Sequence, residues 1–372
     1  SLEMNRFISL LKKEPVLIVS AICAVISMFF YAPSAEYIGY INFRVLCLLF
    51  SLMAVVAGFT KCGLFDILAQ KVIKKCHSSL GLGIILVMLT FFCSMFITND
   101  VSLITFVPFT ILLLGMTGQR KNMILIIVLQ TVAANLGSMA IPIGNPQNLY
   151  LFSEYNISGG DFFSVMTVYT VISLILVLGG CFLIKREKID MPVKIDTEIN
   201  SRRDLAVYAV LFAISFLAVF RVVSYVITTA VTFIVILIMD REIFKKVDFL
   251  LLLTFVFFFI FSGNLGNIDS VSGLLSEAIN KNTMLTSVIA SQFISNVPAA
   301  VLLSGFTGDW KSLLIGTNIG GLGTPVASMA RLISLKLYMN EKDAENKKYM
   351  LVFLAVNIIC LAVLLAAEFI IG

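Results

Sequence analysis

Long apolar stretches separated by short polar ones are the dominant pattern along the chain. At 1.5 Å per residue, an apolar run of about 20 residues crosses the roughly 30 Å hydrocarbon core of a bilayer as a helix. We therefore expect an all-α integral membrane protein with about nine spans. The predicted spans are 15–31, 44–60, 123–150, 162–184, 205–220, 222–239, 248–265, 312–338 and 349–371.

Two further pairs of apolar runs are each divided by a polar tip. The first pair, 80–97 and 101–115, flanks the letters TND, and the second, 283–294 and 299–307, flanks SNVP. The runs of the second pair are too short for each to cross the membrane, and those of the first are of marginal length. We expect both pairs to form re-entrant hairpins that enter and leave on one side.

The positive charges predict which side each loop faces, because Lys and Arg collect in cytoplasmic loops. With the N-terminus inside and both pairs folded as hairpins, 23 of the 27 Lys and Arg residues lie on the inner side. The count would be the same if 80–97 and 101–115 were two full spans, so charge does not separate these alternatives. The four exceptions are Arg44, Arg221, Lys281 and Lys311.

The chain also repeats itself. FITNDV (96–101) aligns with FISNVP 197 residues later, while NLGS and IPIG from the 123–150 span align with NIGG and TPVA 183 residues later. Each half runs span, span, amphipathic stretch, hairpin, broken span, span, but with opposite orientation. We expect two inverted repeats, 1–184 and 222–372, joined by a cytoplasmic linker and connecting span, 185–221. This architecture is typical of secondary transporters, whose sites lie at the membrane midplane.

Two spans contain sequences that cannot form an uninterrupted helix. NLGSMAIPIGNPQN (135–148) and NIGGLGTPVAS (318–328) carry glycines and prolines, which break a helix in the bilayer. Carbonyl groups freed by a break can coordinate a cation, and the N-terminus of a half-helix can face an anion. The residues that we expect to bind H⁺ or Na⁺ as the coupling ion are Asp100, Asn135, Gly137, Gly144, Asn318 and Gly320.

The polar hairpin tips are expected to reach the same cavity, where their amide and hydroxyl groups can bind a substrate. Since a tip could also serve only as a helix cap, both interpretations are kept for Thr98–Asp100 and for Ser295. The residues that we expect to bind substrate are Thr98, Asn99, Asn145, Ser295, Asn296, Thr324 and Ser328.

Composition makes two charges conspicuous. Because 59% of the residues are hydrophobic and only 13% are charged, a charge at membrane depth, which costs roughly 2.5–3.5 kcal/mol, needs a function. Asp100 is such a residue, and we expect it to bind the coupling ion. Arg331 aligns with Asn148 and is either an anion contact or an arginine that extends to the cytoplasmic surface of the membrane. The short segment ahead of Met4 is expected to come from a cloning vector.

The motifs ITNDVSLITFVP, IPIGNPQNL, SNVPAAVLL and GTNIGGLGTPVAS resemble signatures of the ion transporter superfamily, which includes arsenite permeases, Na⁺/H⁺ antiporters and citrate carriers. The resemblance covers nearly the whole chain and is strongest to arsenite-permease and citrate-carrier-like bacterial inner-membrane proteins. It implies that substrate and coupling ion bind at the two tips and two breaks, and that the protein is a homodimer. The first tip reads TND, whereas the hairpin tips of dicarboxylate carriers in this superfamily read Ser-Asn-Thr.

These observations predict a secondary active transporter in a bacterial inner membrane that moves a small anion or oxyacid by alternating access, coupled to H⁺ or Na⁺. The alternative is a Na⁺/H⁺ antiporter that has no anionic substrate. An enzyme is not expected, since Asp100 is the one acid clearly at mid-membrane, and a pump would need a P-loop. We expect no cofactor apart from Na⁺ as coupling ion, membrane lipid as a partner, and no nucleic acid.

Overall fold

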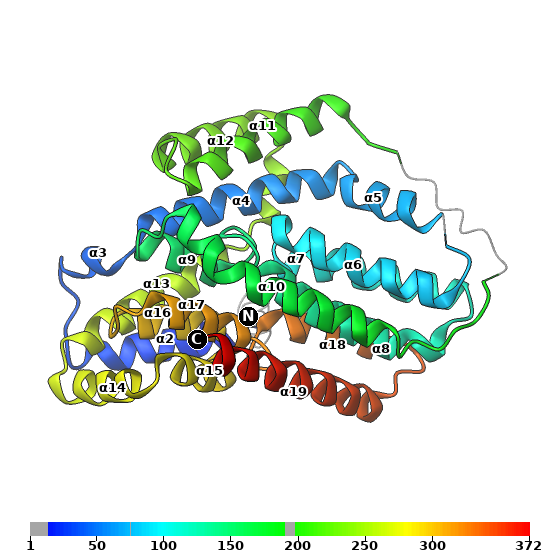
Figure 1. Ribbon diagram of the computed structural model, residues 1–372. Coiled ribbons are helices and arrows are strands. Elements are labelled where there is room, and N and C mark those ends of the chain that lie inside the picture. Colours follow the sequence, from blue (N-terminus) through cyan, green and yellow to red (C-terminus); the bar gives the residue numbers. More distant parts are fainter. Residues whose placement is uncertain (1–13, 75, 190–197) are drawn as a thin grey trace, which may run out of the picture.

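The computed structural model describes residues 14–74, 76–189 and 198–372, and this part of the chain is helical with no β-strand. The helices run nearly parallel or antiparallel through most of the molecule, with α11 and α12 packed over α4 at one side (Figure 1). The elements of the first half are α2 (Pro15–Met28), α3 (Tyr37–Tyr40), α4 (Phe43–Lys61), α5 (Leu64–Ile73), α6 (Ser79–Ile97), α7 (Asn99–Met116), α8 (Arg120–Ser138), α9 (Pro146–Glu154) and α10 (Gly159–Cys181).

The second half repeats this mixture of long and short helices. Its elements are α11 (Arg202–Val219), α12 (Tyr225–Met239), the 3₁₀ helix η1 (Arg241–Lys246), α13 (Phe249–Gly266), α14 (Asp269–Lys281), α15 (Thr283–Ile294), α16 (Asn296–Ser304), α17 (Trp310–Ile319), α18 (Met329–Met339) and α19 (Asn346–Ile371). The amphipathic stretch predicted ahead of the hairpin in each half is present as a helix, α5 in the first half and α14 in the second.

The helices have the length and composition of membrane spans, which confirms the predicted class. Seven of the described helices are long and apolar enough to cross a bilayer, namely α4, α6, α7, α8, α10, α13 and α19. Shorter apolar helices are α2, α12 and α15. Large apolar side chains such as Phe29, Ile175 and Ile238 are exposed on the outer surface, where hydrocarbon would be their natural solvent.

Two helices are interrupted where the sequence predicts it. The first stops at the end of α8 and resumes at Pro146, the first residue of α9, so residues 139–145 form break 1. The second stops at the end of α17 and resumes with α18, so residues 320–328 form break 2. Pro142 and Pro325 fall inside the breaks, where the N–H that proline lacks is not needed for a helical hydrogen bond.

The two predicted hairpins are antiparallel helix pairs joined by a single residue. α6 and α7 meet at Thr98, and α15 and α16 meet at Ser295. With 12 and 9 residues, α15 and α16 reach about 18 and 14 Å, which is too short for either to cross the membrane alone. Since α6 and α7 are each long enough to cross, the re-entrant course of the first pair stays a prediction.

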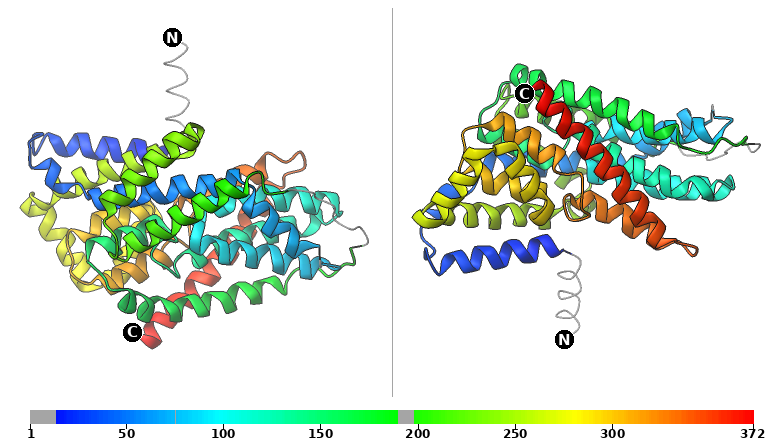
Figure 2. Two further views of the ribbon diagram at one scale, coloured as in Figure 1. Left: turned by 90° about the horizontal axis from the view of Figure 1, so that it is seen from above. Right: turned by 60° about the horizontal axis from the view of Figure 1, so that its bottom comes forward.

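Loops that were predicted to share a side of the membrane do lie together. Arg120 forms an ion pair of 3.3 Å with Asp343, Gln119 donates to Glu187, and Asn200 donates to the carbonyl of Lys61. These basic loops gather at the right of Figure 1, while α3 and α14 lie at the left, and Figure 2 shows the same separation from two other directions. The predicted grouping of loops is thus consistent with the structure.

At the opposite end, two of the four exceptional cations bind main-chain carbonyls. Arg44 donates to the carbonyls of Ala218 and Val219 at the end of α11. Arg221 donates to those of Phe152 and Ile157. Both cations therefore have carbonyl partners at the end of the molecule that was predicted to be outside. Several cations assigned to the inner side lie outside the described residues, namely Arg6, Lys12, Lys13, Lys75 and Lys194.

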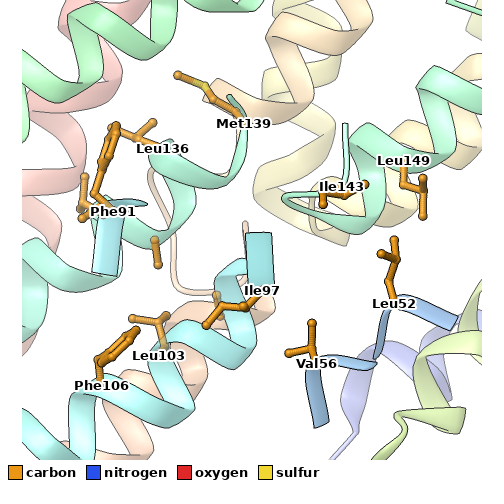
Figure 3. Close-up of a cluster of buried hydrophobic side chains, with 14 of the residues drawn as sticks. Leu52, Val56, Phe91, Ile97, Leu103, Phe106, Leu136, Met139, Ile143 and Leu149 are labelled. Atoms are coloured by element: carbon orange, nitrogen blue, oxygen red, sulfur yellow. The ribbon is translucent and has the colours of Figure 1, made fainter. Parts of the chain in front are cut away.

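A continuous apolar core surrounds break 1 and the tip of the first hairpin. Figure 3 shows buried side chains of α4, α6, α7, α8 and α9 that face the space around this break. Ile97 and Leu103 lie on either side of the first tip, while Leu52 of α4 faces Leu149 of α9 (Figure 3). Because these residues exclude water, the polar groups among them must find partners within the protein or in a ligand.

Candidate functional site

The two hairpin tips have the same unusual backbone conformation. Thr98 has φ 72° and ψ 157°, and Ser295 has φ 74° and ψ 156°. Residues with a side chain rarely adopt positive φ, and a site that holds one there is under strain of order 1–3 kcal/mol. Neither side chain makes a capping hydrogen bond to the helix that follows. Thr98 and Ser295 therefore occupy the cap positions of α7 and α16 without capping them through their side chains.

At the first tip, the side chains of Asn99 and Asp100 differ in how they are bonded. Asn99 is buried, and its Oδ1 accepts a hydrogen bond of 2.9 Å from the amide of Asp100. The Asp100 carboxylate is half-buried, and its Oδ1 is enclosed without a hydrogen-bond partner among the described residues. An enclosed carboxylate oxygen without a donor is suited to bind a proton or a cation.

The two broken helices are joined to each other by buried asparagines. Asn145 Nδ2 donates to Ser138 Oγ at 3.1 Å and to Asn318 Oδ1 at 3.0 Å. Asn318 Nδ2 donates to Asn148 Oδ1 at 2.6 Å, and Asn135 Nδ2 donates to the carbonyl of Asn318 at 3.4 Å. The structure therefore brings together three predicted site residues, Asn135, Asn145 and Asn318. It adds Ser138 and Asn148, which the predictions did not include.

Both of those additional residues hold the chain of break 1 in place. Ser138 Oγ donates to the carbonyl of Asn135 at 2.9 Å. Asn148 Nδ2 donates to the carbonyls of Met139 and Ile141, which lie within the break. A polar residue directly beside a glycine- and proline-rich break is the sequence signal that could have found them, because freed carbonyls need donors.

The second tip is bonded directly to break 2. The amide of Asn296 donates to the carbonyl of Ala327 at 3.0 Å, and Ser295 Oγ lies 3.5 Å from the same oxygen. Both side chains are buried. The amide Nδ2 of Asn296 has no partner among the described residues, so this tip presents a free donor inside the protein.

Gln292, near the end of α15, organises break 2. Its Nε2 donates to the carbonyls of Gly320 and Leu322, each at 2.8 Å. Its Oε1 accepts from the amide of Thr324 at 2.9 Å. Thr324, a predicted substrate residue, is exposed and donates its hydroxyl to the carbonyl of Gln292. Ser328 is buried just before α18 and makes no side-chain cap.

The predicted glycines lie where helices approach closely. A Cβ on Gly137 would meet the carbonyl of Phe91 and Ser94 Oγ in α6. A Cβ on Gly320 would lie 2.9 Å from Ser291 Oγ in α15, and one on Gly144 would meet the carbonyl of Ser138. Close packing therefore accounts for these three glycines without an ion. Ser94 and Ser291, which contact Gly137 and Gly320, are themselves matched at the 197-residue offset.

Among the charged residues that the structure describes, Arg331 is the most completely enclosed, at 1% exposure. Its Nη1 donates to the carbonyl of Thr324 at 3.2 Å, and its guanidinium lies 5.5 Å from the centre of the Phe353 ring. Nε and Nη2 have no partner, and none of the described carboxylates forms an ion pair with it. The alternative of an arginine that extends to the membrane surface is therefore wrong, because the group is buried beneath α19.

Together, the tips and breaks present both hydrogen-bond donors and acceptors that have no partner among the described residues. The unpartnered donors are on Arg331 and Asn296, and the unpartnered acceptors are Asn135 Oδ1 and Asp100 Oδ1. Buried polar atoms are nearly always paired, so these five atoms on four residues mark the tips and breaks as a candidate ligand site. Donors with a positive charge suit an anion, and a carboxylate oxygen without a hydrogen-bond donor suits H⁺ or Na⁺.

Comparisons with known proteins give matches over most of the chain. The family model described as "Citrate transporter" matches residues 7–307. The "Uncharacterized transporter MJ0456" of Methanocaldococcus jannaschii is 34% identical over 300 residues, covering 80% of this chain and 81% of that protein. The "Inner membrane protein YbiR" of Escherichia coli is 28% identical over 321 residues, or 84% and 85%. The human "P protein" is 30% identical over 147 residues, covering 39% of this chain and 17% of its own.

Proposed function

Because the chain belongs to the citrate transporter family, and is therefore a multi-pass membrane transporter and not an enzyme, we propose that it is a secondary carrier for a small anion or oxyacid. The membership confirms the resemblance to the ion transporter superfamily. In this proposal the substrate is driven by H⁺ or Na⁺, and the carrier is a homodimer in the bacterial inner membrane with its N-terminus inside.

The burial of Arg331 without a counterion among the described residues is the observation that carries the proposal. A buried charge without a counterion is unfavourable by several kcal/mol, unless something of opposite charge binds there in the working protein. Arg331 lies in the first turn of α18, where the partial positive charge of a helix N-terminus adds to its own. Two free N–H groups and a helix N-terminus support a site for an anionic oxygen.

Alternating access is proposed through two inverted repeats. The matching backbone at Thr98 and Ser295, and the matching contacts of Gly137 with Ser94 and of Gly320 with Ser291, support this division. In this proposal the site lies between tips that open to opposite sides. Asp100 supplies the coupling, because a carboxylate that is dry in one state and hydrated in the other takes up a proton or Na⁺ in the dry state.

The alternative function, a Na⁺/H⁺ antiporter without an anionic substrate, is favoured by one observation, the unpartnered Oδ1 of Asp100. Uptake into proteoliposomes decides between the two. The purified chain is tested with citrate, phosphate and arsenite, each with and without imposed pH and Na⁺ gradients. We expect gradient-dependent uptake of at least one solute, and its loss in Arg331→Gln. Na⁺-dependent proton movement in the absence of every anion would establish the antiporter instead.

A further inference from the structure

A groove of about 530 Å³ lies between the C-terminal ends of α7 and α18, and its lining residues are separate from the tips and breaks. Pro108, Leu112 and Met116 line it along α7, over a length of about 12 Å at 1.5 Å per residue. Leu112 and Met116 are more than half exposed, and a Cβ on Gly115 would meet nothing within 4 Å. The apolar wall is thus open, and the volume is within the range of about 300–1,000 Å³ that is usual for ligand sites.

The polar end of the groove carries charges of both signs. Arg120, the first residue of α8, and Glu341, which follows α18, line this end. Arg120 Nη1 lies 3.9 Å from Glu341 Oε2 and 3.3 Å from Asp343 Oδ2. The side chains of Arg120 and Asp343 are more than half exposed, and exposed ion pairs contribute little by themselves. A cation and two carboxylates are therefore available to a ligand that matches both signs.

The groove extends from apolar residues within a membrane span to charged residues beyond the end of that span. α7 is long and apolar enough to cross a bilayer, and it ends at Met116, shortly before Arg120. Arg120 belongs to the basic loops that gather at one end of the molecule, at the right of Figure 1. In the proposed orientation, the apolar part lies at the depth of acyl chains and the charged end at the inner layer of lipid headgroups.

We propose that this groove binds a phospholipid with an ammonium headgroup, phosphatidylethanolamine, whose phosphate contacts Arg120 and whose ammonium contacts Glu341 and Asp343. One acyl chain lies along the wall from Pro108 to Met116. The match is one of charge, because an anionic lipid would bring its phosphate beside two carboxylates with nothing to offset them. Phosphatidylcholine has the same charges, but its quaternary nitrogen has no N–H to donate, whereas a primary ammonium has three. The inference goes beyond the proposed function and does not depend on the substrate.

The two helices that form the groove both carry charged residues of the candidate site at their other ends. Asp100 is the second residue of α7, and Arg331 is the third residue of α18. A lipid that contacts both helices stabilises their relative position. Since a ligand that binds only the folded protein raises its melting temperature, occupation of the groove has a readout that does not require transport.

Lipid binding to the purified full chain tests the headgroup. The delipidated protein in detergent is titrated with phosphatidylethanolamine, phosphatidylcholine and phosphatidylglycerol of identical acyl chains, and binding is followed by native mass spectrometry and by thermal melting. We expect phosphatidylethanolamine to bind most tightly and to raise the melting temperature most. Arg120→Gln and Glu341→Gln should each weaken its binding roughly five-fold, as expected for the loss of one exposed charge contact. Lys348→Gln is the control, because it removes an exposed ion pair, with Glu345, that is not part of the groove.

The acyl-chain part of the groove is tested by filling it. Gly115→Leu places a side chain in the open space beside Leu112, and the backbone of Gly115 does not have the positive φ that would strain a leucine. We expect this variant to fold, to melt without lipid at or above the wild-type temperature, and to lose most phosphatidylethanolamine binding. Gly179→Leu on α10 is the matched control, because a Cβ there also meets nothing within 4 Å.

Three results would overturn the inference. The first is equal binding of all three lipids, and the second is tightest binding of phosphatidylglycerol, which would leave Arg120 as a phosphate contact without the ammonium. The third is wild-type binding of phosphatidylethanolamine by Gly115→Leu, which would place the lipid elsewhere on the protein. None of these results affects the proposed transport function, and failure of every substrate in the uptake assay would leave the lipid site standing.

Discussion

Asn135 donates a hydrogen bond of 3.4 Å to the carbonyl of Asn318, the residue that matches it 183 positions later. In a protein built from two related halves, equivalent residues touch each other only near the axis that relates the halves. The breaks therefore meet at the centre of the proposed symmetry. This is the place where a site can be reached equally from both sides.

The asparagine network should contribute strongly to stability. Asn318→Leu removes the partner of Asn148 Oδ1 and one partner of Asn145 Nδ2, and each buried group left unpaired costs about 1–3 kcal/mol. We expect a clear fall in the melting temperature in detergent. Asn357→Leu is the control, because Asn357 Nδ2 bonds only the carbonyl of Phe353 in its own helix. Equal effects of the two substitutions would contradict a shared role for the network.

Arg331 should matter for substrate rather than for folding. Arg331→Met removes a buried charge that has no counterion, so the melting temperature should stay the same or rise. Substrate binding should weaken at least about ten-fold, since each hydrogen bond from a charged group is worth about 1.5–3 kcal/mol. Arg331→Lys should recover only part of it, because lysine lacks the planar fork of N–H groups. A large loss of stability with unchanged uptake would make Arg331 structural.

Asp100 should be required for accumulation but not for folding. Asp100→Asn keeps the size of the side chain and removes its ability to exchange a proton or Na⁺. We expect this variant to bind substrate and to equilibrate it across the membrane, but not to concentrate it. The measurement is uptake against an imposed pH or Na⁺ gradient, with Asp66→Asn on α5 as the control. Accumulation at the wild-type level would remove Asp100 from the coupling mechanism.

The turns that close the two hairpins should face opposite sides of the membrane. Single cysteines at Met116, which is exposed at the end of α7, and at Gly308, where a side chain meets nothing, should react with a membrane-impermeant maleimide from the cytoplasm and periplasm respectively. Gly118 is less suitable because its φ is +70°. The seven native cysteines are first replaced by serine or alanine. Labelling of both from one side would rule out the inverted repeats.

Much of the fold could be predicted from apolar run lengths, because a bilayer fixes how long a spanning helix must be. The positions of both breaks followed from the combination of glycines and prolines in 135–148 and 318–328, whereas a single proline, Pro108, is accommodated inside α7. The partners of the site residues could not be predicted in this way. Which carbonyls Gln292 binds depends on how α15 lies against break 2, and the burial of Arg331 depends on the path of α19.

The shared conformation of Thr98 and Ser295 places backbone strain at both hairpin tips. Glycine would adopt these angles at no steric cost, yet the chain has a hydroxyl-bearing residue at both positions. Holding this conformation costs about 1–3 kcal/mol at each tip, a cost that a conformation with negative φ at these residues would not carry. A chain with glycine at both positions should melt at a higher temperature, because the strain is removed. It should also transport more slowly, because the conformation described here would be more stable relative to the others that transport requires.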